Sequence, residues 1–225
     1  MGNVATYLGV LVGVGDTISL VLGDKSDVVG WGGAENGAEG GPEGSDWEHA
    51  HRALYPSSDA ERAATRRDAY EDEGGLRHFV RVRGALGSDV VALDVDYGGY
   101  LQAFAVGDAL VIAGPSFTQE DHDEQDFAAE PPQALLDAMK ALAARETLLF
   151  VGTVSCPTGE LACLPSTAPG RPFSTATLHG AAVQVDFAVE CGLLVGVVAG
   201  THRLFRGQVE GAWGEADCVV VRPAK

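Results

Sequence analysis

A short strand-turn-strand pattern occurs four times in this chain and constrains the fold more than any other feature. Its copies cover residues 7–24, 99–115, 149–165 and 193–207. In each copy, a run of β-branched or aromatic residues meets a glycine-containing turn, and a second apolar run follows. Such runs are typical of β-strands, and such turns of tight hairpins. We therefore expect four hairpins in two related β-rich halves, although hairpins of this kind also arise independently.

The remaining segments add helices and predict an α+β fold, made mostly of antiparallel β hairpins with two or three helices. Residues 46–54 form a helical segment that Ser45 or Asp46 can cap. Residues 60–72 form a second one, where Ser58 and Glu61 have the spacing of a capping box. A third helix opens at two prolines and runs over 131–145, with an apolar stripe that docks on a core.

The strand over 76–83 contains the main candidate for a ligand-facing polar group. Its alternation places His78 on the inner face with Val80 and Val82, and Phe79 with the three arginines on the outer face. An inward histidine among valines is either a core residue or part of a ligand pocket.

The charge distribution suggests a division of the chain. The net charge is −17, of which −9 falls in residues 1–75, −7 in 76–130 and −1 in 131–225. We expect an acidic β-rich domain over 1–128, with a glycine-rich loop and short helices. A helix followed by an antiparallel β domain would cover 129–225, and the two parts can also be fused into one domain.

Composition also bears on partners and compartment. A strongly negative field disfavours nucleic acid and anionic membranes, and it speeds encounter with a basic partner, although it also serves solubility. No apolar run is long enough for a membrane span, and the N-terminus lacks the features of a signal peptide. We therefore expect a cytoplasmic protein. Its four cysteines are expected to be reduced core residues: Cys156, Cys163, Cys191 and Cys218.

The catalytic and metal-binding motifs that can be recognised by spacing are missing from the sequence. It contains no G-x-S-x-G, P-loop or H-E-x-x-H pattern, and no dinucleotide-binding glycine motif that leads from a strand into a helix. His49 and His51 point apart on a helix, so they cannot share an ion. The acidic stretch 119–126 lacks the central glycine and final glutamate of an EF-hand. We expect no enzyme activity, no metal and no cofactor.

The N-terminal strands resemble a family of bacterial immunity proteins. The resemblance lies in Tyr7-Leu8-Gly9-Val10, Val14-Gly15-Asp16 and the run 20–24, followed by Trp31, and in a later glycine-glycine-leucine strand over 74–81. These elements are similar to the immunity protein 21 family of polymorphic toxin systems. Here Lys25-Ser26 replaces the family's acidic-proline pair, and the C-terminal half has no counterpart. The resemblance implies an α+β fold and the binding of a co-encoded toxin, without catalytic residues.

These observations predict an immunity or inhibitor protein that neutralises a cognate toxin through an acidic surface. A basic target such as a nuclease toxin would suit this charge, and tryptophans beside glycine and acid are suitable interface anchors. The expected contact residues are Trp31, Glu35, Glu39, Glu43, Asp46, Trp47 and Glu48. The alternatives are a small-ligand-binding β module, in which His78 would face the ligand, an uncharacterised hydrolase, and a subunit that associates through strand edges.

Overall fold

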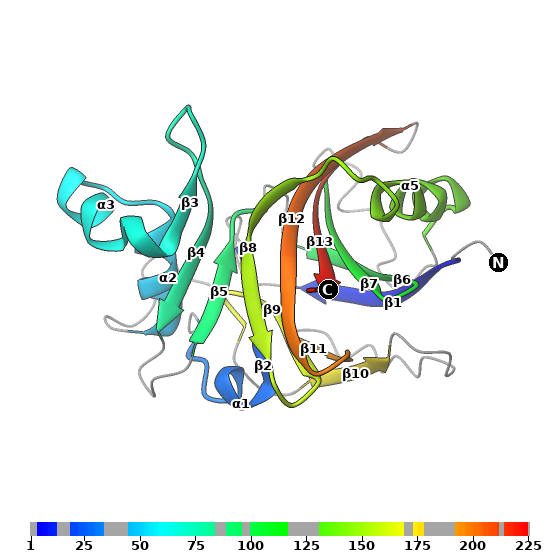
Figure 1. The fold of residues 1–225 in the computed structure, drawn as a ribbon, viewed down its shortest axis with the longest axis horizontal. Helices are drawn as coiled ribbons and strands as arrows, with labels where there is room; N and C mark the ends of the chain where they lie inside the picture. Colours follow the sequence, from blue (N-terminus) through cyan, green and yellow to red (C-terminus); the bar gives the residue numbers. More distant parts are fainter. Residues whose placement is uncertain are drawn as a thin grey trace.

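Two β-sheets face each other, and helices lie on their outer faces (Figure 1). In the computed structural model the described residues are 4–12, 19–33, 45–83, 89–95, 100–116, 131–168, 173–177, 192–211 and 214–224. Several strands are buried on both faces, as in β2, where every residue is buried. Apolar residues therefore fill consecutive strand positions, since each sheet is covered on both sides.

Sheet A has six strands and sheet B has seven. In spatial order, sheet A consists of β1 (Ala5–Val12), β6 (Tyr100–Val106), β7 (Ala109–Ser116), β13 (Gly214–Pro223), β12 (Gly200–Gly211) and β8 (Leu149–Cys156). Sheet B consists of β10 (Phe173–Thr177), β11 (Gly192–Gly196), β9 (Glu160–Pro165), β2 (Leu20–Asp24), β5 (Asp89–Leu93), β4 (Arg77–Arg83) and β3 (Ala69–Glu71). All neighbouring strands are antiparallel except β10 and β11, which are parallel.

The helical segments are short and lie between strands. They are α1 (Lys25–Val28), α2 (Asp46–Leu54), α3 (Asp59–Thr65), the 3-10 turn η2 (Arg66–Asp68) and α5 (Gln133–Ala143). With these helices and the mostly antiparallel sheets, the α+β fold class is confirmed.

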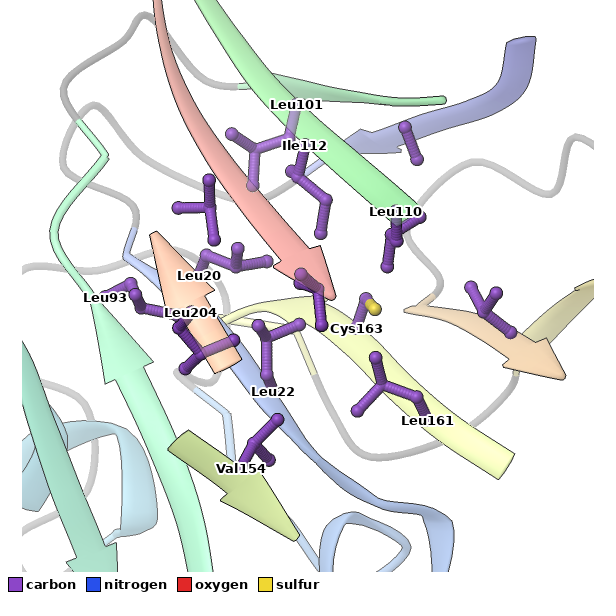
Figure 2. Close-up of a cluster of buried hydrophobic side chains, with 14 of the residues drawn as sticks. Leu20, Leu22, Leu93, Leu101, Leu110, Ile112, Val154, Leu161, Cys163 and Leu204 are labelled. Atoms are coloured by element: carbon purple, nitrogen blue, oxygen red, sulfur yellow. The ribbon is translucent and has the colours of Figure 1, made fainter. Parts of the chain in front are cut away.

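The central core lies between the two sheets. Leu22 of sheet B belongs to the same buried cluster as Ile112 and Leu204 of sheet A (Figure 2). Strands from both sides of residue 128 contribute to this cluster and to both sheets. The proposed boundary at 128/129 itself lies outside the described residues.

Two further cores lie on the outer faces of the sheets. On sheet A, α5 buries Leu135, Met139 and Leu142, the apolar stripe that the sequence predicts. On sheet B, α1 and α2 cover the strands together with Trp31. Figure 1 shows α5 on one side of the molecule and α2 with α3 on the other.

Local capping signals locate the helix starts correctly. Ser45 Oγ accepts a hydrogen bond from Glu48 N at 3.1 Å, and Ser58 Oγ accepts one from Glu61 N at 3.3 Å. The predicted helix over 60–72 is too long, because the chain leaves α3 through η2 and enters β3 at residue 69. Pairing with β4 supplies the backbone partners of these last residues, and this tertiary contact overrides helix propensity.

Only one of the four expected hairpins forms. The copy at 99–115 is the β6–β7 hairpin, with a positive φ at Gly107. In the other three copies, 7–24, 149–165 and 193–207, the two strands belong to different sheets. A glycine turn reverses the chain but does not determine the partner strand, and an apolar strand that is buried on both faces, such as β2, is compatible with either sheet. The expectation of four hairpins is therefore wrong.

The two halves nevertheless share one topology. A two-fold rotation between β7 and β13 exchanges β1 with β8, β6 with β12 and β7 with β13 in sheet A. In sheet B, a two-fold rotation between β2 and β9 exchanges these two strands with each other and β5 with β11. At the centre of sheet A, Val111 of β7 pairs with Val220 of β13. The five equivalent strands therefore give the fold a pseudo-two-fold axis between β7 and β13 and between β2 and β9.

A shared β-bulge supports this equivalence at the level of single residues. Residues 7–9 in β1 and 150–152 in β8 both read aromatic, aliphatic, glycine, and in both the middle residue has no partner in the ladder. The aromatic ring of each bulge packs on an aromatic ring of the neighbouring strand: Phe104, at 5.5 Å between centroids, in the first half, and Phe205, at 5.7 Å, in the second. Matching bulges of this kind are designed features of a fold.

Candidate functional site

The seven predicted contact residues fall within residues 31–48, which contain five acidic residues and no lysine or arginine. Three of them, Glu35, Glu39 and Glu43, lie outside the described residues. The other four are described and lie on either side of the acidic segment 34–44 in the sequence. We call the residues that flank it, 31–33 and 45–48, the segment base.

Two hydrogen bonds close the segment base. Gly32 N donates to Asp46 Oδ2 at 2.9 Å, and Trp47 N donates to Gly32 O at 3.0 Å. Asp46 is the first residue of α2 and is only 9% exposed. Its carboxylate therefore holds the two ends of the segment together, which is a structural task.

Trp31 anchors the segment base to sheet B. Its indole is 5% exposed, and its Nε1–H donates to Ser166 O at 2.9 Å, just beyond the end of β9. The ring packs in the outer core with Val28 and Leu54. Trp31 thus supports the position of the acidic segment and presents little surface of its own.

Trp47 and Glu48 lie on the first turn of α2. The Trp47 ring stacks on His51 with centroids 5.3 Å apart, and its Nε1–H has no acceptor among the described residues. Burial lowers the pKa of His51. Glu48 forms an ion pair with Arg52 at 2.6 Å. Arg52 therefore offsets the charge of Glu48.

A second polar group joins the two sheets around His78. The register of β3 and β4 shifts beside this residue, since Tyr70 pairs with Phe79 and Glu71 with Arg77. His78 Nε2 lies 2.9 Å from Asp72 Oδ2, and its Nδ1 is in contact with an Nη of Arg206 from β12. Since a guanidinium only donates, this network assigns the ring proton to Nε2.

Acidic partners on both sheets complete the His78 network. Arg206 Nη2 donates to Asp217 Oδ2 at 3.0 Å, and Arg206 Nη1 lies 3.9 Å from Asp94 Oδ2. Tyr55 donates to Asp94 Oδ1 at 2.6 Å. Both nitrogens of His78 therefore have partners within the network. The network joins the two sheets through the contact of His78 on β4 with Arg206 on β12.

The shift in register also corrects the predicted faces of the strand over 76–83. Val80 and Val82 pack under the helices outside sheet B, whereas Phe79 enters the core between the sheets. Arg77, expected on a basic outer face, is 1% exposed and donates to Ala53 O at 2.7 Å and Arg62 O at 2.6 Å. The irregular position therefore separates Arg77 and His78 from the regular alternation of residues 79–82.

The described cysteines are free and buried, as the sequence predicts: Cys156, Cys163 and Cys218. Burial raises the pKa of Cys156 and of Cys218 to about 12 and raises that of Cys163 further. Cys191 lies outside the described residues. Within the ranges that the structure covers, no three His, Cys, Asp or Glu side chains come together as metal ligands, and no helix is long and apolar enough to cross a membrane.

The chain was compared with known proteins at three levels. No protein-family model, no curated protein and no solved structure matches it.

Proposed function

We propose that this protein is an immunity or inhibitor protein that binds a basic toxin domain through the acidic segment 34–44. The observation that carries the proposal is the segment base, where Gly32, Asp46 and Trp47 hold the two ends of the segment together. The resemblance of the N-terminal strands to immunity proteins supports the same function. In this proposal the protein has no catalytic residue and works by covering its target.

The physics of the segment base favours a binding role over a solubilising one. A chain segment whose two ends are fixed samples fewer conformations than a free tail and loses less entropy on binding. The segment contains three glutamates, and residues 31–48 contain no lysine or arginine. A basic partner is therefore attracted over a distance set by the screening length of the solution, and it meets a site whose ends are already positioned.

In the proposed complex, the residues of the segment base have different roles. Trp31 and Asp46 fix the residues that flank the segment, because both side chains are buried and hydrogen-bonded. Glu35, Glu39 and Glu43 supply the attraction. Trp47 is 8% exposed and its indole N–H is buried, so it supports the segment base in the same way as Trp31.

Charge reversal of the segment tests the proposal. The partner is the protein encoded beside this chain, made catalytically inactive if it is toxic. The variant E35K/E39K/E43K should associate about tenfold more slowly or worse at low salt, with a weaker dependence of the rate on salt. The control D137K/E146K/E210K makes the same change in net charge at exposed positions of the opposite half, and it should keep most of the wild-type rate. Equal rates for the two variants would reject the segment as the binding surface.

A further inference from the structure

A pocket of about 370 Å³ lies on the outer face of sheet A, far in sequence from the acidic segment. The end of α5 forms one wall, and β6, β7, β12 and β13 supply the rest. Its charged lining residues are Asp108, Arg203 and Arg222, and its apolar ones include Val106, Phe205 and Pro223. This volume is within the range of sites for small organic ligands.

The pseudo-two-fold axis provides an internal comparison for this pocket. In the first half, the ring of Phe104 is fully buried in the core under α5, together with the partly buried Tyr7. The equivalent pair in the second half is Phe205 and Phe150, and here Phe150 is 42% exposed. The inner ring of the pair is buried in both halves, since Phe205 is 8% exposed, and only the outer ring, Phe150, is open in the second half.

The arginines are specific to the open half. Arg203 and Arg222 lie directly opposite each other in the β12–β13 ladder, and the equivalent pair in the β6–β7 ladder is Gln102 and Ala113. Like charges directly across a sheet destabilise it. Neither arginine forms an ion pair with a described residue. The fold thus keeps an unfavourable cationic pair at this pocket and not at its counterpart.

The aromatic rings and the end of α5 hold these arginines in place. The Arg203 guanidinium lies 5.0 Å from the centroids of both Phe150 and Phe205, and that of Arg222 lies 5.1 Å from Phe205. Arg222 Nη2 also donates to Ala143 O at 2.9 Å. Two positioned guanidiniums beside an apolar wall can bind a carboxylate while the body of the ligand packs on the rings.

We propose that the pocket formed by Arg203, Arg222 and Phe205 binds a small organic monoanion, a carboxylate attached to an aromatic or aliphatic body. The two arginines and Asp108 together leave a local charge of +1, which a monoanion neutralises. A dianion such as phosphate would leave excess negative charge in a protein of net charge −17. This ligand site is independent of the acidic segment.

Phenylacetate is the probe, and phenylacetamide is its neutral match. Heteronuclear NMR on the full chain should show saturable shifts for residues around the pocket, with a dissociation constant of about 1–10 mM or lower for so small a ligand. The amide should bind at least tenfold more weakly, and inorganic phosphate should bind more weakly than phenylacetate. R203Q should reduce the affinity at least tenfold, whereas R67Q, at an exposed position on η2, should leave it unchanged.

Several results would overturn the proposal. They are the absence of saturable shifts with phenylacetate, equal affinity for the amide, tighter binding of phosphate, or unchanged affinity in R203Q. Because Arg222 also binds the end of α5, R222Q is interpreted only if its melting temperature matches that of the wild type. R203K is the second variant. It keeps the charge but loses the planar fork, and should bind with intermediate affinity.

Discussion

His202 is a buried histidine whose replacement by leucine should stabilise the protein. It is 2% exposed on β12, and neither of its ring nitrogens has a partner at good hydrogen-bond geometry among the described residues; a weak contact with the Gly200 backbone opposes, without cancelling, the effect of burial on its pKa. It lies two positions from Leu204 and so shares its face, toward the core between the sheets. Under the pseudo-two-fold axis its counterpart is Leu101, because Leu101 pairs with Leu11 as His202 pairs with Val154.

The expected gain follows from the unmet hydrogen bonds. A buried polar group without a partner costs about 1–3 kcal/mol, and leucine removes that cost while keeping an apolar side chain of similar volume. We therefore expect His202→Leu to raise the free energy of unfolding by about 1–3 kcal/mol at pH 8. The first half of the protein already tolerates leucine at this position, so severe overpacking is not expected.

The gain should also depend on pH. Burial lowers the pKa of His202 below its ordinary value of 6.5, so the unfolded chain takes up a proton at a higher pH than the folded one. The wild type therefore loses stability as the pH falls below about 6.5, by at most about 1.4 kcal/mol per pH unit from this residue, until the folded pKa is reached. The leucine variant lacks this loss, and its advantage should widen between pH 7 and pH 5.

Urea denaturation at pH 8, 6.5 and 5.5 measures both effects. The control is His49→Gln, at an exposed position of α2, which should change stability by less than about 0.5 kcal/mol. A variant less stable than the wild type at every pH would refute the claim that the ring is unsatisfied. An advantage of constant size across pH would refute the role assigned to its protonation.

Three further predictions concern single residues. Burial would raise the pKa of Asp24, but hydrogen bonds from Ser26 and Thr158 lower it from 3.8 to about 2. This stabilisation is complete above about pH 4 and is lost as the pH falls to 2. Asp24→Asn should therefore lower the free energy of unfolding, measured in urea at pH 7, by roughly 2.5 kcal/mol, and the variant's stability should depend less on pH below 4. Arg77→Met should lower the free energy of unfolding by about 3 kcal/mol or more, because it removes a buried cation that binds carbonyls at the ends of two helices. The control Arg66→Met, at an exposed position, should change the free energy of unfolding little. Iodoacetamide at pH 8 should leave the three described cysteines unmodified in the native protein and label them in urea, as counted by mass spectrometry, because they are buried thiols of raised pKa.

The features predicted correctly from sequence are local ones. The caps at Ser45 and Ser58 and the apolar stripe of α5 depend on residues within a few positions of each other, and each is present in the structure. The positions of the strands are also largely predictable, since short apolar runs rich in β-branched residues are typical of β-strands. These signals act along the chain and need no knowledge of tertiary partners.

Strand partners were not predictable, because pairing is decided by contacts distant in sequence. A strand such as β2 is apolar on both faces, so its sequence is equally consistent with a hairpin and with a crossing to the opposite sheet. The irregularity beside His78 shows the same limit on a smaller scale, because one shifted position separates Arg77 and His78 from the alternation of the rest of β4. Alternation alone cannot locate such a shift.

Of the two candidate sites, one is visible in the sequence and the other depends on strand pairing. The acidic segment is visible in the sequence as a run of glutamates among glycines, and the roles of Glu35, Glu39 and Glu43 remain a prediction. The pocket of Arg203 and Arg222 was missed, because these residues are nineteen positions apart and meet only through the register of β12 and β13. The repeated aromatic-aliphatic-glycine bulge was the available signal, since it aligns the halves and exposes the difference at these positions.

The most direct test of the proposed function is co-purification of the tagged chain with the protein encoded beside it, at low and at high salt. The proposal predicts a stoichiometric complex with the wild type that forms faster at low salt, and a weakened complex with E35K/E39K/E43K. Elution of the wild-type chain alone under both conditions would contradict it.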